Sequence, residues 1–131
     1  MDDIEFLSEE DIFTYHLLDE GYMGGMLTAT ASRAFEEVSS KYDKIKEIYI
    51  SLYGKDEKTP KEEQLYEKCF SNLVLEASMR IWNSKDHALI EQYGVISQEP
   101  NLDPMQIVLM EALKSVIERK GLDIPKNGKT F

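Results

Sequence analysis

One long amphipathic segment, residues 27–53, constrains the fold more than any other part of the sequence. Apolar side chains recur in it at alternating spacings of four and three residues, at Ala31, Phe35, Val38, Tyr42, Ile45, Tyr49 and Leu52. Only a helix presents a seam of this period, 3.5 residues, on one side. The seam therefore predicts a long central helix over 27–53. Because aromatic side chains fill every second position of the seam, it favours packing within the chain over a self-made two-stranded coiled coil.

Capping residues predict where the other helices begin and end. Side chains that can accept from the first free amides of a helix precede four apolar stretches, at Ser8, Thr59, Ser84 and Asp103. Glycines that can end a helix follow, at Gly21, Gly54, Gly94 and Gly121. Gly54, just past the long helix, is expected to adopt the left-handed conformation.

These signals predict an all-α fold, a single-domain helical bundle of four long helices and a short fifth over 84–93. No stretch has the alternation that is typical of a strand. At 131 residues the chain is long enough to bury one core, so 1–131 is expected to be one domain, with 1–7 and 122–131 as flexible ends. Expected core side chains are Phe35, Tyr42, Phe70, Leu73 and Trp82.

Negative charge is concentrated at the start of the chain. The formal net charge is −10, and the first 20 residues hold eight acids and no lysine or arginine. The rest of the chain holds 17 acids and 15 bases. Such a field repels phosphate and anionic lipid and attracts a basic surface. Two interpretations stay open: a solubilising end with acids that favour a helix N-terminus, or an acidic docking surface.

On the docking interpretation, six acids set partner binding and two phenylalanines anchor it. The predicted partner-binding residues are Asp2, Asp3, Glu5, Phe6, Glu9, Glu10, Asp11 and Phe13. The expected partner is a protein with a basic surface, such as a nucleic-acid-binding groove. Direct binding of nucleic acid is not expected, because acids interrupt the lysines of 41–46. A homo-oligomer stays open.

No catalytic or metal-binding motif emerges from the sequence. A di-iron bundle needs Glu-x-x-His, but the residues three before His16 and His87 are Phe13 and Ser84. Cys69 lies on an apolar stripe and is expected to be a small buried hydrophobe rather than a nucleophile. We therefore expect no cofactor, no metal and no enzymatic activity.

One comparison keeps a hydrolase open as a further alternative. The stretch 62–67, Glu-Glu-Gln-Leu-Tyr-Glu, resembles the Glu-Glu-x-x-Glu magnesium motif of helical nucleotide pyrophosphohydrolases of the MazG type. It is one residue longer between its acids, and the companion Glu-x-x-Asp is missing. A small helical Mg-dependent nucleotide hydrolase is what this resemblance implies.

Size, acidity and helicity together favour a non-enzymatic protein-interaction module, an inhibitor or regulator. In these compositional properties the chain is similar to small phage-encoded inhibitors, anti-CRISPR proteins among them, and to bacterial toxin-immunity proteins. The alternative is a structural or assembly subunit, or an adaptor, of a larger complex; it predicts exposed apolar surface. A single cysteine, an acidic start and no long apolar run lead us to expect a cytoplasmic protein with no membrane contact.

Overall fold

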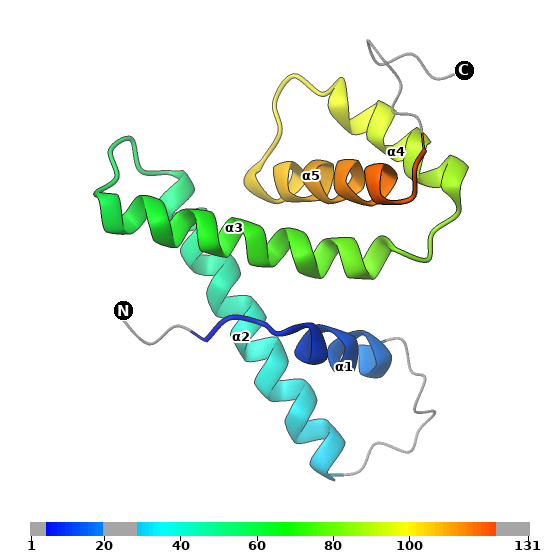
Figure 1. The fold of residues 1–131 in the computed structure, drawn as a ribbon. Coiled ribbons are helices and arrows are strands. Elements are labelled where there is room, and N and C mark those ends of the chain that lie inside the picture. Colours follow the sequence, from blue (N-terminus) through cyan, green and yellow to red (C-terminus); the bar gives the residue numbers. More distant parts are fainter. Residues whose placement is uncertain (1–4, 20–28, 123–131) are drawn as a thin grey trace. The chain divides into compact units, whose positions relative to one another are not determined.

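The computed structural model describes residues 5–19 and 29–122, and in these two ranges it contains helices and loops but no strand (Figure 1). The helices are α1 (Glu9–Asp19), α2 (Ala29–Tyr53), α3 (Pro60–Ile81), α4 (Asp86–Ser97) and α5 (Pro104–Arg119). The predicted all-α fold is confirmed, and α2 is the long helix predicted over 27–53; residues 27 and 28 lie outside the described residues. Gly21 and the predicted flexible ends, apart from 5–7 and Leu122, lie outside the described residues.

Three of the helices are long and two are short. α2, α3 and α5 contain 25, 22 and 16 residues, whereas α1 and α4 contain 11 and 12. The prediction of four long helices and a short fifth is therefore right in number and close in proportion. None of the helices in the described part of the chain is both long enough and apolar enough to cross a membrane.

Two of the predicted capping residues, Thr59 and Asp103, form reciprocal capping boxes. The Glu62 amide donates to Thr59 Oγ1 at 3.2 Å, and the Thr59 amide donates back to Glu62 Oε1 at 2.9 Å. Asp103 and Gln106 make the same reciprocal pair at 2.8 and 2.9 Å. These bonds satisfy amides that the first turn of a helix leaves without a partner, so α3 and α5 begin where the sequence predicts.

The predicted limits of α4 are wrong at both ends. Its N-cap is Lys85, whose side chain makes no capping bond, and not Ser84. The helix also continues through Gly94 and ends at Ser97. Gly94 is buried, and Ile96 joins the apolar core between α4 and α5. Burial of that next turn outweighs the low helix propensity of glycine, which costs about 1 kcal/mol.

The end of α2 also differs from its prediction. Gly54 is not left-handed; among the described glycines the positive φ belongs to Gly121, at 71°. The amides of Gly54 and Lys55 donate instead to the carbonyls of Ile50 and Leu52, at 3.2 and 3.1 Å. These bonds occupy carbonyls of the last turn without a left-handed residue. Gly121 follows α5 as predicted.

Close packing divides the chain into two compact units, Met1–Glu76 and Ala77–Phe131. Buried apolar side chains of the first unit are Leu7, Ile12, Val38, Ile45, Tyr49, Leu52, Cys69 and Leu73. The core of the second is built around Leu89, Ile96, Leu113, Val116 and Ile117. The boundary between the two units falls inside α3, so one continuous helix contributes to both. A single domain over 1–131 stays a prediction.

The predicted core is right for Leu73 and wrong for Trp82. Leu73 is 1% exposed, whereas Trp82 is 43% exposed. Trp82 follows the last residue of α3, so the apolar stripe of the helix no longer directs it inward. Its ring lies 5.2 Å from the Lys120 ammonium, a cation–π contact at the surface. The other predicted core side chains are half-buried, namely Phe35, Tyr42 and Phe70.

We predict that Leu73→Ala lowers the free energy of unfolding by about 2–5 kcal/mol, because it leaves a cavity in a closed core. Trp82→Ala should cost clearly less, since its side chain is already largely in water. Urea unfolding followed by circular dichroism measures both. A loss at Trp82 equal to that at Leu73 would contradict this assignment.

Candidate protein-interaction face

The segment that leads into α1 is bound to α3 by one amide side chain. Asn72 accepts from the Leu7 amide and donates to the Leu7 carbonyl, both at 2.9 Å. Both backbone polar groups of Leu7 are thereby satisfied while its side chain is buried. Asn72 thus holds the residue that precedes the cap of α1 against α3.

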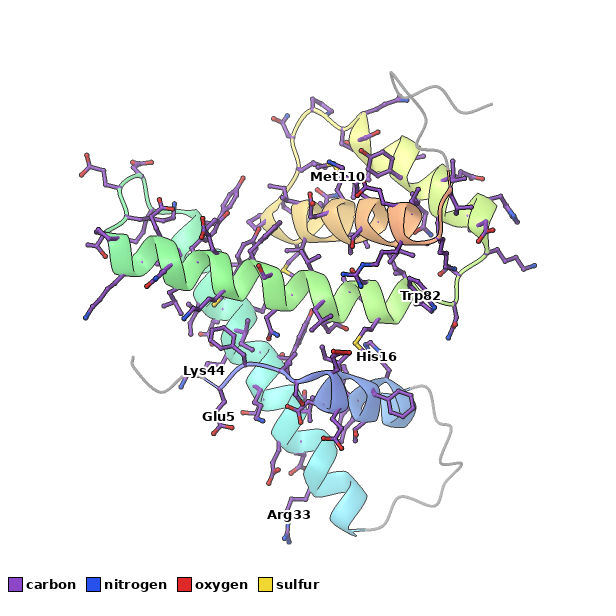
Figure 2. The ribbon with its side chains drawn as sticks, in the orientation of Figure 1. Glu5, His16, Arg33, Lys44, Trp82 and Met110 are labelled. Carbon is purple, nitrogen blue, oxygen red and sulfur yellow. The ribbon has the colours of Figure 1, made fainter. Side chains whose placement is uncertain are left out.

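A second bond joins the later part of α1 to α3. His16 Nε2 lies 2.8 Å from Glu76 Oε2, and the two side chains are 16% and 5% exposed. Figure 2 shows His16 on the side of α1 that faces α3. A carboxylate this deeply buried needs hydrogen-bonding partners, and His16 supplies one. His16 therefore acts in the fold.

One lysine of α2 binds two of the acids that the sequence assigns to partner binding. Lys41 Nζ lies 3.3 Å from Glu5 Oε2 and 3.3 Å from Asp11 Oδ2. Asp11 also builds a capping box, since its amide donates to Ser8 Oγ at 3.0 Å and its carboxylate accepts from the Ser8 amide at 3.1 Å. Partial burial works to raise the pKa of Asp11, but the Ser8 amide and the Lys41 ammonium outweigh it and hold that pKa below its ordinary value.

Aromatic rings complete the contact between α1 and α2. The Tyr15 ring stacks on Phe35 with 5.0 Å between ring centroids, and on Tyr42 with 6.2 Å. Offset stacking of this kind adds stabilisation beyond the area it buries. One side of α1 is therefore occupied by α2 and α3.

The opposite side of α1 faces solvent and carries three side chains of the predicted site. Glu9 and Glu10 are exposed, and Phe13 is 58% exposed. Glu9 and Glu10 lie four and three residues before Phe13, so the three side chains share one helical face. No ion pair or hydrogen bond within the described residues occupies either carboxylate. We refer to Glu9, Glu10 and Phe13 as the α1 face.

The remaining predicted partner-binding residues do not belong to this face. Asp2 and Asp3 lie outside the described residues. Glu5 and Asp11 are engaged by Lys41, although Glu5 stays 77% exposed. Phe6 is half-buried and lines a shallow hollow on α3.

The charge of the molecule follows its division into two units. Residues 1–76 contain 18 acids and 8 bases, a balance of −10, whereas 77–131 contain seven of each. All of the net charge therefore lies in the unit that carries the α1 face. As the sequence indicates, most of this charge lies in residues 1–20, which hold eight acids and no lysine or arginine, whereas residues 21–76 hold 10 acids and 8 bases. The sequence does not show that the second unit is neutral, because no local signal marks a unit boundary inside a helix.

Two residues with the chemistry of a catalytic site, Glu62 and Cys69, are engaged elsewhere or buried, whereas Glu63 and Glu67 are exposed. Within 5–19 and 29–122, no group of three His, Cys, Asp or Glu is placed to hold a metal ion. Glu62, in the stretch that resembles a magnesium motif, caps α3 and pairs with Lys55. Cys69 is fully buried, and burial raises the pKa of its thiol to about 11. The hydrolase alternative stays a prediction.

The chain matches no protein-family model, no curated protein and no solved structure. Function is therefore inferred from the side chains of the candidate site, because a fold by itself does not determine function.

We predict that Asp11 makes the first unit sensitive to acid. A carboxyl whose pKa is lowered on folding stabilises the fold above its ordinary pKa of 3.8, and this contribution is lost as the pH falls from there through the lowered value. In urea unfolding between about pH 5 and pH 2, Asp11→Asn should show a shallower fall in unfolding free energy than the wild type. Glu10→Gln, at an exposed acid of the same turn, is the matched control. Equal slopes for Asp11→Asn and the wild type would contradict the assignment.

Proposed function

We propose that this chain is a non-enzymatic protein-interaction module whose α1 face docks on a basic surface of a partner protein and inhibits or regulates it. The observation that carries the proposal is Phe13. Phe13 is 58% exposed on a helix whose other side is packed, and two carboxylates without a partner among the described residues share its face. Aromatic side chains are enriched in the core of protein interfaces, and polar groups surround them at the rim.

The bonds behind the α1 face favour binding without a large ordering cost. Asn72 and Glu76 on α3, with Lys41 on α2, hold the helix that carries Phe13. Association then immobilises few additional groups, so more of the contact energy contributes to affinity. In such interfaces a buried aromatic anchor commonly contributes 2 kcal/mol or more, about thirtyfold in affinity.

The negative charge of the first unit favours a partner with a basic surface. The balance of −10 over residues 1–76 steers a positively charged surface toward this unit and repels an acidic one. We propose a partner with lysine or arginine around an apolar pocket that accepts the Phe13 ring. Where that surface is a nucleic-acid-binding groove, the carboxylates of Glu9 and Glu10 would occupy the positions of phosphates. Binding would then compete with nucleic acid, as an inhibitor does.

A separate observation favours the alternative of an assembly subunit or adaptor. Val95 on α4, in the neutral second unit, is 63% exposed and more exposed than Phe13. Exposed apolar surface outside the α1 face is what a second contact would require.

The test compares three variants of the full chain against a partner captured from a lysate of the native host and then purified. Glu9→Lys with Glu10→Lys, and separately Phe13→Ala, should each raise the dissociation constant about tenfold or more, a loss of about 1.4 kcal/mol in binding free energy. Binding by the wild type should also weaken as salt rises. Asp11 is left unchanged, because its carboxylate caps α1.

The matched control is Glu63→Lys with Glu67→Lys, which changes the charge of the same unit equally at two exposed positions of α3. The affinity of this control should stay within about twofold to threefold of the wild type, because it changes long-range steering but leaves the α1 face intact. Equal loss in the control would mean that bulk charge alone drives binding. An unchanged affinity for Phe13→Ala would contradict the proposal.

A further inference from the structure

The second unit carries an open apolar groove between α4 and α5, which lie side by side (Figure 1). Its volume is about 330 Å³, and it is lined by Glu91, Gln92, Val95, Ile96, Glu99, Gln106, Leu109 and Leu113. Ile96 and Leu113 are 8% and 0% exposed and belong to the core of the unit, whereas Val95 is 63% exposed. The groove therefore places the exposed side chain of Val95 beside two side chains of the core.

Carboxylates flank the apolar surface of the groove. Glu91 lies four residues before Val95 and Glu99 four after it, so Glu91 and Val95 share a face of α4 and Glu99 follows its end. This row extends over about two helical turns, roughly 12 Å. Both acids are exposed, and no ion pair among the described residues occupies them. None of the eight lining residues is basic.

The charge of the rim selects among the possible occupants. A second copy of this chain, paired about a two-fold axis, would bring the same acidic rims toward one another, which like-charge repulsion disfavours. An apolar groove two turns long suits instead the apolar row of a helix, whose side chains repeat every three or four residues. Lysine or arginine beside that row would meet Glu91 and Glu99.

We propose that this groove binds an amphipathic helix of a partner protein, with an apolar row toward Val95 and Leu109 and basic residues toward the acidic rim. The contact belongs to the second unit and does not depend on the α1 face. A chain with both contacts would join two partners, or two parts of one partner, as an adaptor does.

The test is an NMR titration of the isotope-labelled full chain with a synthetic helical peptide of about 16 residues. Leucines in the peptide alternate at spacings of four and three, and lysines flank them. We expect saturable shifts at the amides of Gln92, Val95, Ile96 and Leu109. A peptide with glutamate in place of every lysine should bind at least about tenfold more weakly, because it meets like charge at the rim.

Protein variants locate the contact. Glu91→Gln with Glu99→Gln should weaken binding about fivefold or more, and Val95→Ser should weaken it similarly; all three positions are exposed, so the fold is kept. Glu111→Gln with Glu118→Gln removes the same charge from α5 outside the groove and should leave binding unchanged. Circular dichroism checks that each variant is folded.

Four outcomes would overturn the proposal. In the titration these are shifts confined to the α1 face, equal affinity for the lysine and glutamate peptides, and no saturable binding below about 1 mM peptide. The fourth is that the free chain forms a dimer that Val95→Ser dissociates. The first would leave the function proposed for the α1 face standing, and the last would place a second copy in the groove.

Discussion

A helix of 11 residues is marginal in water by itself, so α1 depends on the bonds that other parts of the chain make to it. Lys41 reaches Asp11 across 30 residues of sequence, Glu76 reaches His16 across 60, and Asn72 reaches Leu7 across 65. Each bond uses a buried or partly buried polar group, and such groups are costly to leave unpaired. The position of α1 is therefore a consequence of α2 and α3, and so is everything that α1 presents to a partner.

This arrangement separates acids of the first unit that build the fold from acids that remain for binding. Asp11 and Glu76 are engaged inside the unit, whereas Glu9 and Glu10 are exposed and unpaired within the described residues. Net charge alone does not make this distinction. The protein proposed here would combine steering by the whole acidic unit with a small fixed contact around Phe13, so salt would act mainly on the rate of association.

Local patterns in the sequence predict most of the fold, because seams and caps are determined within a few residues. Ile45 and Tyr49 of the predicted seam are both 0% exposed. The candidate site was predicted less well. Asn72 and Glu76 leave no local pattern, since their partners are 60 or more residues away. Ile12 and Phe13 look alike in sequence, yet they are 0% and 58% exposed, and only the packing of α1 distinguishes them.

The most direct test of this account is hydrogen exchange of the backbone amides of α1, followed by NMR in the free, full-length chain. If α2 and α3 hold α1, the amides of residues 12–16 exchange only through the opening that also exposes the seam of α2 near Ile45. Their free energies of exchange would then equal those of the seam within about 1 kcal/mol. Exchange of 12–16 near the rate of an unfolded chain, with the seam still protected, would contradict a fixed α1 face.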